Sequence, residues 1–237
     1  MPSAPQEFAP DFRARRIDPD EDANSMQAIF RLRFDVYCHE FGYLPASAHP
    51  DERESDRYDT VSVHFGAFNL KAELVGYVRL VAADGAGRFP FHHHGAVLFP
   101  GHPWPDPDDG REISRLMVRH DYRRRQGDTL AGAIVPDHHA DQAERRIHSP
   151  QILLSMFRQM YQFSLGCNTR YWYATMDRSL TRSLIAQGFN FLRIGPTLDY
   201  FGPVAPYLAD LRGLEARVQA AQPALLNWLR RADPERA

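Results

Sequence analysis

The chain has 237 residues, enough for one large domain or two small ones with a sizeable hydrophobic core. Hydrophobic residues make up 43% and charged residues 24% of the sequence, as in ordinary soluble globular proteins. The net charge of −2 excludes a general electrostatic attraction to nucleic acid. All but one of the 28 basic residues are arginine, whose planar guanidinium groups suit carboxylates and phosphates.

The cysteines and the N-terminal residues indicate an intracellular protein without a membrane span. Cys38 and Cys167 are too few for a disulfide framework, and their neighbours give no metal-ligand spacing. Residues 1–23 lack the apolar core of a signal peptide. No apolar run reaches the ~18 residues that a transmembrane helix requires. We therefore expect a cytoplasmic protein.

Polar segments and apolar patterns alternate in the first third of the sequence. Residues 1–24 are rich in Pro, Asp and Arg and are expected to form an arm. Asn24 or Ser25 can cap a helix that continues to Gly42 with apolar residues at helical spacing. The expected elements that follow are a polar loop at 52–62 and two strands, at 63–70 and 73–84, joined by a short turn.

The remainder of the sequence predicts two strands on either side of a long helix. A connection rich in Pro, Gly and Asp leads to the first strand, at 112–118, and residues 119–148 give no clear pattern. Ser149 caps the helix, with Pro150 in its first turn and Gly166 near its end. The later expected elements are a strand at 169–177, a helix at 178–188, a strand from 190, and an amphipathic helical segment at 206–231 that is interrupted near Pro223.

This order of elements predicts an α/β fold with a mixed sheet. Strand, long helix and strand across 112–175 fit a right-handed crossover, which makes the two strands parallel neighbours. The expected regions are an N-terminal arm at 1–24, a single domain at 25–205, and a C-terminal helical extension at 206–237 packed on that domain. Because the final helix is expected to pack across its own domain, a monomer or weak dimer is predicted.

Polar side chains occupy the segment 112–118, which otherwise has the pattern of a buried strand. Because alternate residues of a strand share a face, one side is expected to carry Glu112, Ser114, Leu116 and Val118, and the other Ile113, Arg115 and Met117. A carboxylate and a guanidinium on a central strand need partners, since an unpaired buried charge is costly. The strand alone leaves two interpretations open, an internal salt bridge or a functional site.

Further polar and aromatic residues lie upstream of this strand. The segment "FRLRFDVYCHEFGY" carries arginine and tyrosines, "ESDRYD" carries two aspartates three apart, and "GYVRLV" places an arginine in an apolar strand. The whole set resembles the pattern of the acyl-homoserine-lactone synthases and the related N-acyl amino acid synthases, which have the GNAT acyltransferase fold. The resemblance covers residues 25–200, and the matching positions are Arg33, Tyr37, Tyr43, Asp56, Asp59, Arg79, Glu112, Ser114 and Arg115. The opening "RFDVYCHEFGYL" is most similar to that of PEP-CTERM/exosortase-associated acyltransferases.

The resemblance implies a GNAT-like mixed central sheet flanked by helices, and transfer of an acyl group from a thioester to an amine. It makes Glu112, Ser114 and Arg115 the catalytic residues, and Glu112 the candidate for taking the proton of the amine. It makes Arg33, Tyr37, Tyr43, Asp56, Asp59 and Arg79 substrate-binding residues, without dividing the roles of the arginines and aspartates. Backbone N–H groups around Leu116 to Val118 are expected to stabilise the oxyanion of the tetrahedral intermediate. No covalent acyl-enzyme and no tightly bound cofactor is required.

Two departures from the family pattern bear on the substrates. Tyr37 and Tyr43 stand where acyl-homoserine-lactone synthases carry phenylalanine and tryptophan, in a region associated with S-adenosylmethionine, so the acceptor pocket is expected to differ. The glycine-rich pyrophosphate loop of coenzyme-A-dependent GNAT enzymes is missing, which favours an acyl carrier protein as donor and leaves acyl-CoA open. The expected donor-binding residues are Leu116, Met117, Val118, Arg119, Arg123, Arg124 and Arg125, with the arginines facing the acidic carrier. The acyl chain is expected between the parted central strands and the 150–166 helix.

Other classes of function fit the sequence less well. The segments "FHHHG" and "PDHH" lack a spaced carboxylate or cysteine partner for a metal. There is no phosphate-binding P-loop, and no basic stripe with aromatic residues indicates nucleic-acid binding. Two alternatives to an N-acyltransferase stay open: a homoserine-lactone synthase that uses S-adenosylmethionine, and a GNAT-like module that binds an acyl group or a carrier protein without turnover.

Overall fold

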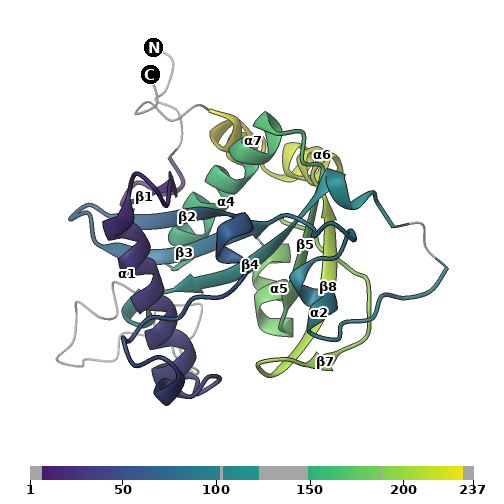
Figure 1. Cartoon of the computed structure of the whole chain (residues 1–237). Coiled ribbons are helices and arrows are strands. Elements are labelled where there is room, and N and C mark those ends of the chain that lie inside the picture. The colour runs from purple at the N-terminus through teal and green to yellow at the C-terminus, as the bar shows by residue number, and fades with distance from the viewer. Residues whose placement is uncertain (1–6, 102–103, 123–148, 187, 232–237) are drawn as a thin grey trace, which may run out of the picture.

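The structure is a computed structural model that describes residues 7–101, 104–122, 149–186 and 188–231 (Figure 1). Its strands are β1 (Phe12–Ile17), β2 (Ser62–Asn69), β3 (Leu74–Val81), β4 (Gly110–Val118), β5 (Tyr171–Met176), β6 (Leu192–Arg193), β7 (Leu198–Asp199) and β8 (Pro203–Asp210). Its helices are α1 (Ala23–Phe34), α2 (Pro90–His93), α4 (Ser149–Gly166), α5 (Arg178–Ala186), α6 (Leu211–Ala221) and α7 (Pro223–Arg230). None of the helices in these described ranges is both long enough and apolar enough to cross a membrane.

One eight-stranded mixed sheet runs through the molecule (Figure 1). The strand order is β1-β2-β3-β4-β5-β8-β6, and β7 pairs with β8. Strands β4 and β5, on either side of α4 in sequence, are parallel, and the other pairs are antiparallel. The predicted α/β fold, with a mixed central sheet and parallel strands on either side of the long helix, is therefore confirmed.

Helices cover both faces of the sheet. On one face, α4 contributes Ile152, Met156 and Phe157 to a core that also contains buried residues of α5, α6 and α7. On the other face, α1 packs Ile29 against Tyr77 of β3, and α2 covers the neighbouring part of the sheet. The two faces differ in what they bury. The α4 side is mainly apolar, with a few buried polar residues of α4 such as Arg158, whereas paired arginine and carboxylate side chains are buried on the α1 side.

The start and end of α1 fix the first part of the site. The side chain of Asp22 caps the helix by accepting the N–H of Ser25 at 3.0 Å. Beyond Phe34 the helix widens into a π-helical turn at Asp35–Glu40, which is a feature often found at functional sites. The backbone oxygen of Tyr37 in this turn accepts the N–H of Tyr43 at 2.8 Å. The turn therefore brings the two tyrosines of the sequence pattern together.

A β-bulge in β4 changes which face its residues occupy. Arg79 pairs with Ser114 and Tyr77 pairs with Met117, so β4 has one residue more than β3 between these pairs. Arg115 lies in the bulge with a φ of 55°, a left-handed conformation that costs a residue other than glycine about 1–3 kcal/mol. The predicted alternation is therefore right up to Ser114 and wrong after it. Arg115 and Met117 lie on the face of Glu112 and Ser114, while Leu116 and Val118 pack toward the α4 side.

Two expected boundaries are wrong. Residues 12–17 of the predicted arm form the edge strand β1, whose buried Phe12, Ala14 and Ile17 are separated by exposed arginines that interrupt any apolar run. The expected boundary at residue 205 falls inside β8, whose residues 205–210 pair with β5. Residues 207–210 are therefore strand, because ladder hydrogen bonds to β5 outweigh their helical pattern, and the helices begin at Leu211.

The C-terminal helices are part of the hydrophobic core, which a core truncation tests. Leu229 of α7 is fully buried, so Leu229→Ala is expected to lower the free energy of unfolding by about 2–5 kcal/mol. The matched control is Leu70→Ala, at a leucine that is 73% exposed, which should change it by less than about 0.5 kcal/mol. Urea denaturation followed by circular dichroism measures both, and equal midpoints for the two variants would show that α7 is not packed as described.

Candidate active site

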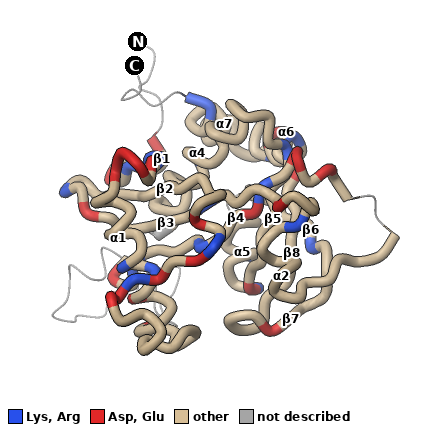
Figure 2. The backbone as a smooth tube through the Cα atoms, in the orientation of Figure 1, with Lys and Arg blue, Asp and Glu red and all other residues tan. Residues whose placement is uncertain are grey.

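A buried network of three arginines and three carboxylates lies between α1, the 54–59 loop and the sheet. Arg33 donates to Glu54 and Asp59, each at 2.5 Å. Arg79 donates to both oxygens of Asp56 at 2.7 Å and to Asp59 at 2.5 Å. Arg115 donates to Glu54 at 3.0 Å and to Asp56 at 2.9 Å. Figure 2 shows acidic and basic positions side by side in this region, and their formal charges cancel.

Burial and ion pairing have opposite effects on the pKa values of the carboxyl groups in this network, and the effect of ion pairing is the larger. Burial alone would raise the pKa of Asp56, but the hydrogen bond and charge of Arg79, with the charges of Arg115 and Arg33, hold that pKa well below its usual range. Burial would likewise raise the pKa of Glu54, which Arg115 and Arg33 lower. Both groups are therefore carboxylates at neutral pH. Each depends on the arginines, because an unpaired charge at this depth is costly.

The loop that carries the carboxylates is held by its own hydrogen bonds. The side chain of Asp59 accepts the N–H of Asp56 at 2.7 Å, and the backbone N–H of Glu54 donates to the oxygen of Phe30 in α1 at 3.0 Å. His64 of β2 lies 2.9 Å from the backbone oxygen of Asp59 and 2.7 Å from the hydroxyl of Tyr77. The network therefore joins α1, the loop and three strands into one rigid wall.

Glu112 is buried beside this network without joining it. One carboxyl oxygen accepts the N–H of Phe91 in α2 at 2.9 Å. The aromatic rings of Phe89, Phe91 and Tyr173 pack against one another in a small hydrophobic cluster. Burial raises the pKa of Glu112 to about 8, although the Phe91 N–H and the charges of Arg79 and Arg115 lower it. At neutral pH this carboxyl group is therefore mostly protonated.

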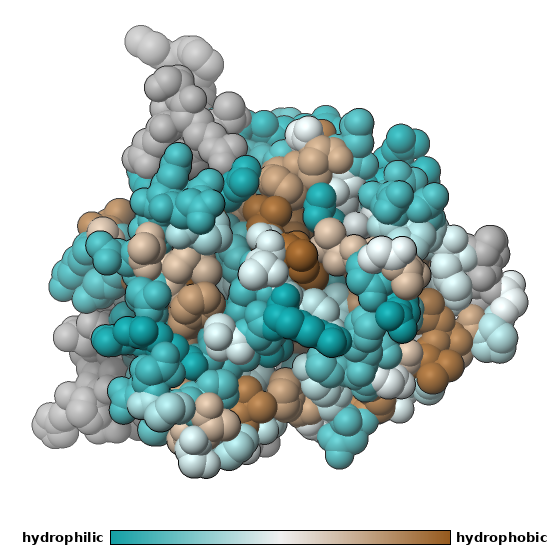
Figure 3. All heavy atoms as spheres, viewed as in Figure 1, coloured by the Kyte–Doolittle hydropathy of each residue, from teal (hydrophilic) through white to brown (hydrophobic). Residues whose placement is uncertain are grey.

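A cavity of about 500 Å³ passes through the sheet where β4 and β5 part. The two strands pair only as far as Ile113 and Ala174, and β4 bulges directly afterwards. Polar residues line the end on the α1 face, where hydrophilic residues dominate the centre of the surface (Figure 3). Apolar residues from α4, α5 and the last strands line the other end, namely Leu153, Phe157, Leu180, Leu184, Phe191 and Val204. One cavity thus joins a polar chamber to an apolar one.

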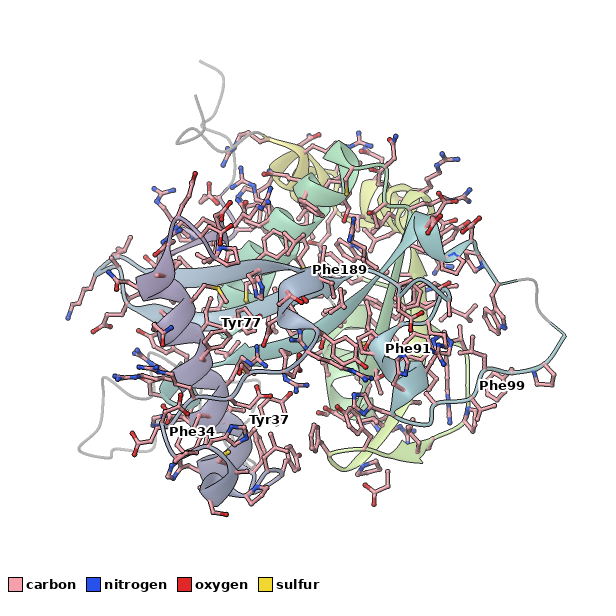
Figure 4. The ribbon with its side chains drawn as sticks, viewed as in Figure 1. Phe34, Tyr37, Tyr77, Phe91, Phe99 and Phe189 are labelled. Carbon is pink, nitrogen blue, oxygen red and sulfur yellow. The ribbon has the colours of Figure 1, made fainter. Side chains whose placement is uncertain are left out.

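Aromatic rings surround the polar end. Tyr43 stacks on Phe201 at 5.1 Å between ring centroids, and Tyr37 lies 5.3 Å from Phe201. The guanidinium of Arg115 lies over the ring of Tyr37 at 4.7 Å, a favourable cation–π contact. His94 stacks on Tyr200 at 4.1 Å. Figure 4 shows Tyr37 on the side of α1 that faces α2, where Phe91 lies.

The structure brings most of the residues expected from the sequence to this cavity. Those that line it are Tyr37, Tyr43, Arg79, Glu112, Ser114, Arg115, Leu116, Met117 and Val118. Arg33, Asp56 and Asp59 are not among the described lining residues, and they support Arg79 and Arg115 from behind. Ser114 lies 3.3 Å from the guanidinium of Arg79.

The structure describes only one of the four arginines that the sequence predicts to bind a carrier protein, and that arginine is already paired. Arg119 is paired with Asp121 through contacts of 2.8 and 3.0 Å, which compete with any acidic partner. Arg123, Arg124 and Arg125 lie outside the described residues.

Several residues at the site were not expected from the sequence. Glu54 stands in the same acidic segment as Asp56, and only this proximity could have indicated it. Tyr58, His94, Tyr200 and Phe201 line the cavity from loops that carry no periodic pattern. His94 belongs to the segment "FHHHG", whose histidines lack a spaced partner for a metal.

Removing one arginine of the network tests its contribution to stability. Arg33→Ala leaves Glu54 and Asp59 without their shared buried partner, so the free energy of unfolding is expected to fall by about 3–5 kcal/mol. Arg57→Ala, at an exposed arginine of the same loop, is the matched control and should leave the urea midpoint unchanged. An unchanged midpoint for Arg33→Ala would contradict the buried network.

Comparisons with known proteins agree with this geometry. Residues 32–133 match the acetyltransferase (GNAT) domain family. A search of curated protein sequences found no match. Among solved structures, the CoA-dependent acyl-homoserine lactone synthase BjaI, bound to SAM and isopentyl-CoA, is 21% identical, with a TM-score of 0.59 over 89% of this chain and 88% of BjaI.

Two further solved structures are similar at lower sequence identity. The AHL synthase LasI is 17% identical, with a TM-score of 0.59 over 89% of this chain and 93% of LasI. FeeM, an N-acyl amino acid synthase from uncultured soil microbes, is 14% identical, with a TM-score of 0.50 over 89% of this chain and 97% of FeeM. Residues 32–133 are therefore similar to the acetyltransferase (GNAT) domain family, and the fold of the chain is that of the solved acyl-homoserine lactone synthases.

Proposed function

We propose that the protein is an N-acyltransferase that moves a fatty acyl group from a thioester to the amino group of an amino acid or similar small amine. The observation that carries this proposal is the single cavity with a polar end and an apolar end. An acyl chain needs an apolar channel. An amine that carries a charged group, such as a carboxylate, needs a polar pocket. The two substrates would meet at the parting of β4 and β5, where Glu112 and Ser114 lie.

The reaction requires a proton acceptor and a group that stabilises negative charge. An α-amino group has a pKa of about 8 and must lose a proton before it attacks. Burial raises the pKa of Glu112 to about 8, so its carboxyl group is able to give a proton during the reaction and to take one back. Backbone N–H groups of β4 beyond Ile113 no longer pair with β5 and would stabilise the oxyanion, at about 3 kcal/mol for each donor.

The polar end suits an acceptor that carries a carboxylate. Of the two guanidinium groups that line the cavity, Arg79 is fully engaged with Asp56, Asp59 and Ser114. Arg115 uses one nitrogen for its carboxylate partners, and its Nε has no hydrogen-bond partner among the described residues. We infer that Arg115, whose side chain lines the cavity, binds the acceptor carboxylate, since guanidinium groups commonly bind carboxylates.

The donor is proposed to be an acyl carrier protein thioester, with acyl-CoA as the alternative, and the reaction is expected in the cytoplasm. Arg178 and Arg182 are exposed on α5, whose inner residues Leu180 and Leu184 line the apolar end of the cavity. Neither arginine makes an ion pair with another described residue. They would attract an acidic carrier to this helix more readily than Arg119, which is paired with Asp121.

A second candidate function is an acyl-homoserine-lactone synthase, which the solved structures favour as folds. It requires S-adenosylmethionine at the polar end, where this chain has two tyrosines with added hydroxyl groups. The resemblance to PEP-CTERM/exosortase-associated acyltransferases stays a prediction from the sequence.

Mass spectrometry of lipid extracts tests the reaction. Cells that overproduce the protein are expected to accumulate N-acyl amino acids, and Glu112→Gln should lower their amount by about 10²- to 10⁴-fold because the proton transfer is lost. Acyl-homoserine lactones in place of these products would establish the second candidate. Extracts identical to those of control cells, from a protein that still retains an acyl group or carrier, would instead establish a binding module without turnover.

The choice of donor is tested by reversing charge on α5. Arg178→Glu combined with Arg182→Glu should lower kcat/KM for an acyl carrier protein donor at least tenfold at low salt, with a smaller effect at high salt. The same variant should use the corresponding acyl-CoA as well as the unaltered protein does. The matched control is Arg212→Glu, at an exposed arginine of α6, which should change neither donor. Equal losses with both donors would exclude carrier docking on α5.

A further inference from the structure

Three consecutive histidines follow Phe91, and each has a different environment. His92 accepts the N–H of Phe89 at 3.0 Å through Nδ1, which caps the short helix α2. His93 lies 3.0 Å from a carboxylate oxygen of Asp84. His94 lines the cavity, and its ring nitrogens have no hydrogen-bond partner among the described residues. Only the third histidine therefore presents free nitrogens to the site.

The same helical turn positions His94 and Glu112. The N–H of Phe91 holds the carboxyl group of Glu112, and the N–H of His94 donates to the backbone oxygen of Phe91 at 3.3 Å. Tyr200 stacks on the imidazole ring and also interacts electrostatically with Arg115 and Glu112. The ring of His94 is thus fixed beside the polar end of the cavity by contacts from two sides.

Burial and the charged groups around His94 favour its neutral form. Burial lowers its pKa, and the charges of Arg115, Arg57 and His93 lower it further against the opposing charge of Asp56. Tyr58 and Tyr200 are the other titratable neighbours, with ring centroids at 6.5 and 4.1 Å. The imidazole therefore has a free lone pair at neutral pH, where it is able to accept a proton.

The carboxyl groups at the cavity and in the ion network behind it are poor proton acceptors at neutral pH. Burial raises the pKa of Glu112 to about 8, so this carboxyl group is mostly protonated at pH 7. Asp177 caps α5 by accepting the N–H groups of Ser179 and Leu180 at 2.6 and 3.0 Å. Burial opposes these bonds, but they hold the pKa of Asp177 below its usual range. Asp56 is engaged by Arg79 and Arg115.

We propose that His94 is a further catalytic residue, which accepts the proton of the incoming ammonium group. This inference rests on the proposed acyltransferase function. The ammonium gives one proton to the imidazole, and the resulting amine forms the C–N bond to the thioester carbon. The C–S bond then breaks, Glu112 gives its proton to the leaving thiolate, and it regains one from the new amide nitrogen. His94 finally returns its proton to solvent.

The pH dependence of the purified protein tests this assignment. The assay uses hexadecanoyl-acyl carrier protein and, separately, hexadecanoyl-CoA as donor, with an equimolar mixture of the twenty amino acids and S-adenosylmethionine. It follows N-acyl product by mass spectrometry from pH 5.5 to 9. His94→Gln is expected to lower product formation at pH 7 by about 10²- to 10⁴-fold and to move the acidic limb of the profile up to about pH 8. His120→Gln, at an exposed histidine that does not line the cavity, is the control and should keep the unaltered profile.

Chemical rescue separates proton transfer from a role in stacking. Added imidazole should restore part of the activity of His94→Ala, because the deleted ring faces the cavity, and it should not affect Glu112→Gln. The inference is overturned if the unaltered protein is active and His94→Gln shares its rate and profile, since Glu112 then takes the proton alone. If the unaltered protein forms no N-acyl product under any of these conditions, the proposed function fails and this inference fails with it.

Discussion

The neutralisation of Arg33, Arg79 and Arg115 by Glu54, Asp56 and Asp59 is the interaction on which the polar half of the site depends. These six side chains come from α1, one loop, β3 and β4, so the network fixes the positions of four segments at once. Buried ion pairs of this kind add little net stability, since desolvation offsets the attraction. Their effect here is to hold two guanidinium groups at the cavity wall while leaving the wall without net charge.

The parting of β4 and β5 creates the other half of the site. Pairing stops at Ile113, and the bulge at Arg115 then turns its guanidinium toward the network and turns Leu116 toward α4. A regular strand would have placed Arg115 in the apolar core, where it would have no carboxylate partner. The strained residue therefore serves both halves, since it completes the ion network and opens a passage to the apolar chamber.

Much of the fold and part of the site follow from the sequence, and the reasons differ from residue to residue. The long helix α4 and the strands β2 to β5 have strong apolar patterns, and their expected positions are close to the observed ones. The bulge left no signal, because nothing in the sequence marks Arg115 for a positive φ. Strands β1 and β8 were missed because arginines interrupt the first and a helical pattern overlaps the second.

The site residues that lie in loops could not be predicted from the sequence, for a different reason. His94 and Tyr200 lie far apart in sequence and reach the cavity through the packing of loops on the sheet, and Glu54 reaches Arg115 in the same way. The neutral state of His94 depends first on its burial and then on the charges of Arg115 and Arg57, which no spacing rule could have supplied. Conversely, the nine residues of the family pattern could be picked out because they follow one another along this chain in the same order as in that pattern.

A crystal structure with a non-hydrolysable acyl-CoA analogue tests the central claim most directly, namely that one cavity brings an acyl chain and an amine together across the sheet. We expect the acyl chain to lie over Leu153 and Phe157, and the carbon that replaces the thioester carbonyl to lie at the parting of β4 and β5 beside Glu112. An analogue bound elsewhere, or with its acyl chain at the polar end beside Arg79 and Arg115, would contradict this account.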